Sequence, residues 1–104
     1  MEVKVGLLSD FMSRKETDAA AAEMATQFMN RLPMERIQDA KRVAAEFEIL
    51  LGHARGFQRK SALGVMGTSR LANGFQWTLI ERGYDADFSR EIGKRLAVKL
   101  AESK

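Results

Sequence analysis

Helical periodicity constrains the fold of this chain more than any other feature. Between residues 37 and 54, apolar residues recur at spacings of 3, 4, 3, 4 and 3, which is the repeat of one face of an α-helix. The alternation of apolar and polar residues that is typical of strands is scarce. We therefore predict an all-α fold, a small bundle of four to five helices that forms a single domain over residues 1–104. The apolar seam consists of Ile37, Ala40, Ala44, Phe47, Leu51 and Ala54, and Val43, Leu50 and Phe57 widen it.

The helix before this seam is predicted from the residues at its two ends. Ser13 and Glu16 have the spacing of a capping box, in which both side chains bind free backbone amides at a helix start. We expect the helix to run from there to about Asn30. Pro33 either stops it, because proline lacks the backbone donor that a helix needs, or begins a new helix as its first residue. Its apolar stripe is Ala21, Met24, Ala25, Phe28, Met29 and Leu32.

Two further helices are predicted in the C-terminal part of the chain. Thr68 or Ser69 caps the first, which runs to residue 82, and Gly83 follows it where a left-handed residue ends many helices. The second begins near Asp85 or Asp87. Their apolar stripes are Leu71, Ala72, Phe75 and Leu79 in the first, and Phe88, Ile92, Leu96 and Leu100 in the second.

The first eight residues fit two structures. Val3, Val5 and Leu7 alternate with polar residues and glycine, as in a short half-buried strand, whereas Leu7, Leu8 and Phe11 also fit one face of a helix. A single strand is not stable alone, so a strand here would have to pair across a dimer or with a partner. Both interpretations are kept open.

Charge is unevenly distributed along the chain. Residues 49–80 contain Arg55, Arg59, Lys60 and Arg70 and no acidic residue, whereas the rest of the chain has thirteen basic and fourteen acidic residues. The formal net charge of +3 is therefore concentrated in this segment, and we expect its glycine-marked, basic middle part to connect the second and third helices. A local excess of one sign favours association with a partner of the opposite sign.

Groups for catalysis and metal binding are scarce. The chain has no cysteine, and its only histidine, His53, is expected to stabilise the end of the second helix. The glycines of residues 64–69 suit a phosphate-binding turn before a helix, but that segment lacks the lysine of a P-loop. A connector followed by a capped helix is the preferred interpretation. We predict no enzyme activity, no cofactor and no metal site.

Trp77 lies off the apolar stripe of its predicted helix, together with Ile80. Either that helix is central and covered on both sides, or Trp77 contacts a second protein, where tryptophan is a frequent anchor. Ile49 lies similarly on the polar side of the second helix. We take Trp77, Ile80 and Ile49 as candidate partner-binding residues.

These features predict a small regulatory or adaptor protein that binds a protein partner with an acidic patch, for example inhibiting or modulating a transcription factor or a larger complex. We expect a homodimer, because the alanine-rich seam of the second helix and the off-stripe Trp77 and Ile49 present more apolar surface than a four-helix monomer easily hides. We also expect the protein to be cytoplasmic and not to associate with membranes, because no run of residues is apolar enough for a membrane span or a signal peptide. The partner-binding residues are Trp77, Ile80, Ile49, Arg55, Arg59, Lys60 and Arg70. The alternative is a basic nucleic-acid-binding protein that uses residues 55–70 and the C-terminal helical hairpin.

Overall fold

A computed structural model describes the backbone of residues 2–102 and the side chains of residues 14–102. Within this part of the chain the fold is all-α, as the periodicity predicts, and it contains no strand. The N-terminal residues are helical, so the strand interpretation of residues 2–8 is wrong. The elements are α1 (Glu2–Arg31), the short 3-10 helix η1 (Met34–Arg36), α2 (Ala40–Lys60), α3 (Val65–Glu81) and α4 (Ala86–Glu102).

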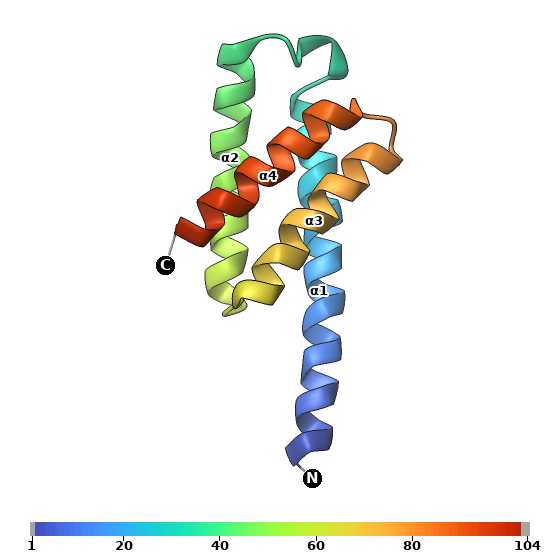
Figure 1. Cartoon of the computed structure of the whole chain (residues 1–104), viewed down its shortest axis with the longest axis vertical. Helices are drawn as coiled ribbons and strands as arrows, with labels where there is room; N and C mark the ends of the chain where they lie inside the picture. Colours follow the sequence, from blue (N-terminus) through green and yellow to red (C-terminus); the bar gives the residue numbers. More distant parts are fainter. Residues whose placement is uncertain (1, 103–104) are drawn as a thin grey trace.

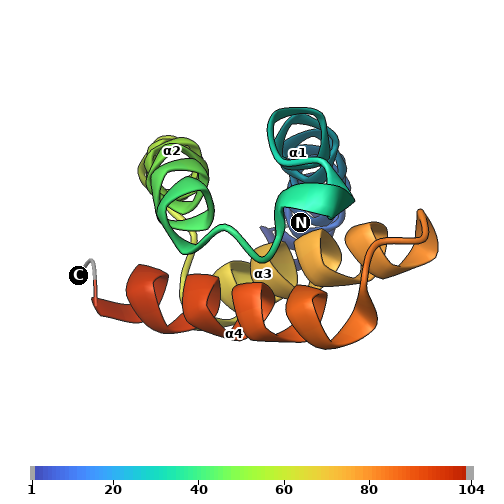
Figure 2. The ribbon, with the colours of Figure 1, turned by 90° about the horizontal axis from the view of Figure 1, so that it is seen from above.

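The helices form two crossed layers. Figure 1 shows α1 and α2 running side by side in opposite directions, while α3 and α4 form a second antiparallel pair that crosses them diagonally. Seen from above in Figure 2, α1 and α2 appear nearly end-on in one layer, and α3 and α4 lie across them in the other. The molecule measures 53 × 27 × 18 Å, and it is elongated because α1 continues past the end of the bundle (Figure 1).

The apolar stripe of α1 is buried as predicted, but the predicted start of the helix is wrong. Ser13 and Glu16 lie inside α1, which is already helical from Glu2, so they do not form an N-terminal capping box. The helix ends at Arg31, and Pro33 then precedes η1. The buried members of the stripe are Ala21, Met24, Ala25, Phe28 and Leu32, with Met29 partly buried.

The buried face of α2 differs from the predicted seam. Asp39 caps the helix by accepting a hydrogen bond from the backbone amide of Arg42 at 3.2 Å. Ala40 and Ala44 are exposed, because α1 and α4 both pack on the side of α2 that carries the larger apolar residues. Spacing alone did not show whether α2 would bury the line with Ala40 and Ala44 or the adjoining line with Val43 and Leu50. The residues that α2 buries are Val43, Phe47, Leu50, Leu51, Ala54 and Gln58.

The connection between α2 and α3 is shorter than predicted. Because α2 continues to Lys60, Arg55, Arg59 and Lys60 lie on a helix and not in a glycine-rich loop. Only residues 61–64 join the two helices. The predicted cap at Thr68 or Ser69 is also wrong, since α3 already begins at residue 65.

Thr68 serves the interior of the bundle instead of a helix end. Its hydroxyl oxygen accepts a hydrogen bond from the side-chain amide of Gln58 at 3.1 Å, and the same amide nitrogen donates to the carbonyl of Leu100 at 3.2 Å. All three residues are buried. This short network joins α2, α3 and α4, and it satisfies polar groups that would be costly to bury alone.

The turn between α3 and α4 matches the prediction. Gly83 has φ +90°, the amide of Gly83 donates to Ile80 at 3.0 Å, and the amide of Tyr84 donates to Leu79 at 3.0 Å. This pair of bonds is a Schellman motif, which favours glycine because left-handed φ is strained for other residues. Asp85 then caps α4, since its carboxylate accepts from the amide of Phe88 at 2.8 Å.

The core lies where the two layers cross. The ring of Phe28 from α1 packs edge-on against Phe75 of α3, with centroids 5.6 Å apart, and against Tyr84, with centroids 6.4 Å apart. Near this cluster α1 and α3 approach closely at Gly74, where an added Cβ would lie 2.9 Å from the Cβ of Ala21. The close crossing fixes which side of α3 faces the core and which side faces outward.

Candidate functional site

One line of exposed residues follows the outward side of α3. Met66, Arg70, Asn73 and Trp77 are spaced by 4, 3 and 4 residues, so they lie on one side of the helix. All four are exposed, Met66 at 86% and Trp77 at 54%. We call these four residues the outer stripe. The opposite side of α3 carries Leu71, Phe75 and Leu79, which are fully buried.

The exposure of Trp77 excludes one of the two sequence interpretations of this residue, the helix that is covered on both sides. A central helix covered on both sides would bury the indole, but no other part of residues 14–102 covers it completely. Ile80 lies one turn further along α3 and is half-buried, so it adjoins the outer stripe. Ile49 is half-buried on α2, which is in the other layer (Figure 2), and therefore does not share this surface.

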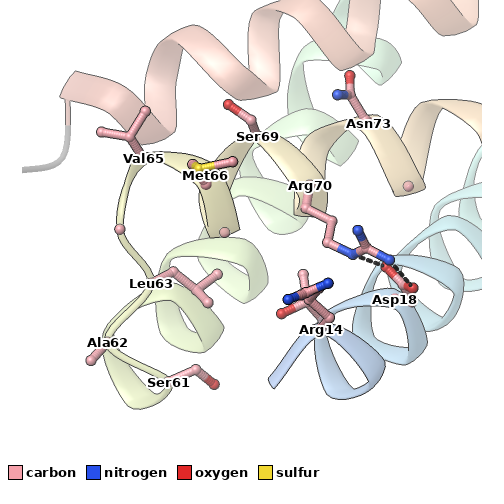
Figure 3. Close-up of a pocket in the computed structure, with 14 residues that line it drawn as sticks. Arg14, Asp18, Ser61, Ala62, Leu63, Val65, Met66, Ser69, Arg70 and Asn73 are labelled. Atoms are coloured by element: carbon pink, nitrogen blue, oxygen red, sulfur yellow. Dashed lines mark hydrogen bonds and ion pairs between the residues drawn. The ribbon is translucent and has the colours of Figure 1, made fainter. Parts of the chain in front are cut away.

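Arg70 has a partner that the local charge count could not reveal. Its guanidinium donates two hydrogen bonds to the carboxylate of Asp18 on α1, both at 2.8 Å (Figure 3). The hydrogen bond with Asp18, and then its charge, raise the pKa of Arg70, which stays protonated. Asp18 is 52 positions away in the sequence, so Arg70 looked unopposed within residues 49–80. The excess positive charge of that segment is reduced by this pair.

The other three basic residues of the segment lie in the last turns of α2. Arg59 and Lys60 are exposed, and Arg55 is partly buried. Cations at a helix C-terminus interact favourably with the helix dipole. Arg59 and Lys60 therefore stabilise the end of α2 and also present positive charge to solvent next to the start of α3.

A groove of about 980 Å³ lies where α1, the α2–α3 turn and α3 meet. Figure 3 shows Arg14 and Asp18 on one wall and Arg70 and Asn73 on the other, with Val65 and Met66 near the turn. Residues 64–69, which we interpreted as a connector before a capped helix in preference to a phosphate-binding turn, border this groove and form the N-cap and first turns of α3. Arg70, the basic residue that directly follows residues 64–69, is already paired with Asp18.

The described residues show no arrangement suited to metal binding or to crossing a membrane. Among side chains 14–102, no group of three or more histidine or acidic residues lies close enough together to hold a metal ion. His53 is exposed on α2. None of the helices in the described part of the chain combines the length and apolar character of a membrane span.

Comparison of the chain with protein-family models, with curated proteins and with solved structures gives no match. The functional importance of the outer stripe must therefore be inferred from the chemistry and geometry of its own residues.

Proposed function

We propose that this chain is a non-enzymatic regulatory or adaptor protein that binds a protein partner through the outer stripe of α3 and acts as a homodimer. The observation that carries the proposal is the half-exposed Trp77 on a helix whose other side is fully buried. Tryptophan is enriched among the residues that contribute most to protein–protein affinity. An exposed indole is not needed to hold α3 in the bundle, because Leu71, Phe75 and Leu79 already do so.

The charges near α3 favour a partner with an acidic patch. The chain carries a net charge of +3, and Arg59 and Lys60 are exposed just before α3 begins. Surface charges of this kind mainly raise the rate of association and set its salt dependence. Arg70 adds a donor on the outer stripe itself, although Asp18 limits its free charge. A transcription factor or a component of a larger complex is the kind of partner that we propose.

Affinity capture from the native host, with and without nuclease treatment, tests the proposal. We expect a protein partner that remains bound after nuclease treatment. Its affinity should fall by about 30-fold or more for Trp77→Ala, which corresponds to roughly 2 kcal/mol or more for the loss of a buried interface anchor. Val98→Ala is the matched control, because Val98 is 50% exposed but lies on α4, outside the outer stripe. Equal losses for the two variants would contradict the proposal.

Salt dependence separates the protein partner from the nucleic-acid alternative. A protein that contacts about four phosphates should lose duplex affinity with salt at a log–log slope of roughly −3.6. We expect no duplex binding tighter than about 10 μM at about 50 mM salt, because Asp18 neutralises Arg70 and Glu91 lies on α4 of the C-terminal hairpin. Replacing Arg55, Arg59 and Lys60 together by alanine should weaken partner binding and flatten its salt dependence. Micromolar duplex binding that survives Trp77→Ala would favour the nucleic-acid alternative.

A further inference from the structure

We propose that the first turns of α1 from one copy of this chain dock into the groove between α1 and α3 of a second copy, and that the second copy makes the same contact in return. The inference specifies the surface of the proposed homodimer and rests on that part of the proposed function. The groove includes Met66, Arg70 and Asn73 of the outer stripe, whereas Trp77 and Ile80 lie further along α3 and are left for the protein partner.

The occupant of the groove is suggested by the shape of the molecule. Figure 1 shows α1 continuing past the bundle, with no other helix beside its first turns. The sequence of these turns, residues 2–13, is half apolar, and isolated helices of about twelve residues are marginal in water. A contact with another helix would stabilise them. The apolar residues of segment 2–13 are Val3, Val5, Leu7, Leu8, Phe11 and Met12.

The receiving surface lies beside the point where α1 leaves the bundle. Val65 and Met66, in the first turn of α3, are 74% and 86% exposed, the highest values among the exposed large apolar residues. They line the 980 Å³ groove together with Arg14, which directly follows the projecting turns of α1, and Asp18, which lies one turn further along that helix. Groups that are apolar and this exposed favour association, because association removes their surface from water.

Symmetry and charge select a second copy as the occupant. Two α1 helices placed side by side in opposite directions, with a two-fold axis near residue 12, bring each projecting segment beside Arg14 and Asp18 and so to the groove of the other copy. Such an isologous contact closes on itself and stops at two chains. The segment carries Glu2, Lys4 and Asp10, a net charge of −1, whereas Arg14, Asp18 and Arg70 give the groove a net charge of +1.

Light scattering on the full chain, from about 1 to 100 μM, tests the proposal. We expect the mass of two chains, and a dissociation constant raised at least about tenfold by Met66→Asp, since burying a carboxylate in an apolar contact is costly. An aspartate in the first turn of α3 suits the helix dipole, so the fold should be retained, which circular dichroism checks. Met34→Asp is the control, because Met34 is also exposed, at 45%, and lies in η1 before the start of α2, whereas Met66 follows the turn at the end of α2. A monomeric chain, or equal effects of the two aspartates, would overturn the inference.

Cysteine pairing gives an independent measurement, because the chain has no cysteine of its own. Leu7→Cys protein mixed with Met66→Cys protein should form the mixed disulfide at least about tenfold faster than Leu7→Cys mixed with Met34→Cys. Equal rates would contradict the docking arrangement. A dimer that captures no partner would leave this inference intact and refute the role of Trp77. A monomer that captures a partner through Trp77 would refute the inference alone.

Discussion

The two sides of α3 differ in burial and therefore in what determines their residues. On the inner side, Leu71, Phe75 and Leu79 are completely buried, whereas on the outer side Met66 is 86% and Trp77 is 54% exposed. The inner residues are required by packing, since they fill the space where α3 crosses α1 and approaches α4. Packing among residues 14–102 leaves these outer residues largely in solvent. The comparison separates residues that specify the fold from residues that remain available for binding.

The largest expected effect contrasts Phe75 with Trp77. Phe75→Ala should lower the free energy of unfolding by about 3–5 kcal/mol, since it removes a buried ring that packs against Phe28 and leaves a cavity. Trp77→Ala should lower it by less than about 1 kcal/mol, because about half of the side chain is already in water. Denaturant unfolding of the two variants measures both values. Similar losses would show that the outer side of α3 is also structural.

A second prediction tests whether the buried side of α3 continues through its C-terminal turn to Tyr84. Burial raises the pKa of Tyr84 to about 12 from its ordinary value of 10.0, and the phenol hydroxyl donates a hydrogen bond to the carbonyl of Leu32. The unfolded chain therefore loses this proton at a lower pH than the folded chain. Stability is complete below about pH 10 and falls between about pH 10 and 12, by up to about 2–3 kcal/mol.

Denaturant unfolding at about pH 9 and pH 11.5 checks this loss. The control is Tyr84→Phe, which should be less stable at pH 9 by roughly 1 kcal/mol, because the hydrogen bond to Leu32 is lost. The variant should also lose less stability than the unmodified chain when the pH is raised. If the two chains respond to pH in the same way, Tyr84 is not the group responsible.

The smallest expected effect concerns the turns that bound α3. Both have the Schellman pattern: the amide of Leu63 donates to Gln58 at 3.0 Å before α3, just as the amide of Tyr84 donates to Leu79 after it. The left-handed residue is Ala62, with φ 52°, in the first turn and Gly83 in the second. Ala62→Gly should raise the free energy of unfolding by roughly 0.5–1 kcal/mol, and Gly83→Ala should lower it by about 1 kcal/mol. The melting temperatures of the two variants should shift in the same directions as their free energies of unfolding. Shifts of the same sign would contradict this account.

The C-terminal hairpin was predicted most fully from the sequence. Gly83 and Asp85 act through local backbone geometry, so their residue types identified the end of α3 and the start of α4. The inner stripe of α3 and the core residues of α4 also followed, because a helix of period 3.6 brings them to one side. The off-stripe position of Trp77 was equally evident, although its exposure was not.

Other predictions were wrong because the same sequence pattern is compatible with two different structures. The capping-box spacing of Ser13 and Glu16 also occurs inside helices, and α1 continues through it. In α2 the sequence contained two adjoining lines of apolar residues, and the placement of α1 and α4 buried the line with Val43 and Leu50, leaving Ala40 and Ala44 exposed. Local sequence patterns did not contain the information needed to place the start of α1 or to identify the buried side of α2.

By itself, the sequence determined that this chain is helical, where α3 ends, and which side of α3 is apolar. These properties depend on residues within a few positions of one another, whose relative placement a helix fixes. Only the tertiary structure decided that Arg70 pairs with Asp18, that Trp77 remains exposed, and that Val65 and Met66 border a groove beside α1. Those contacts join residues up to 52 positions apart, and they exist only after the two helical layers have packed together.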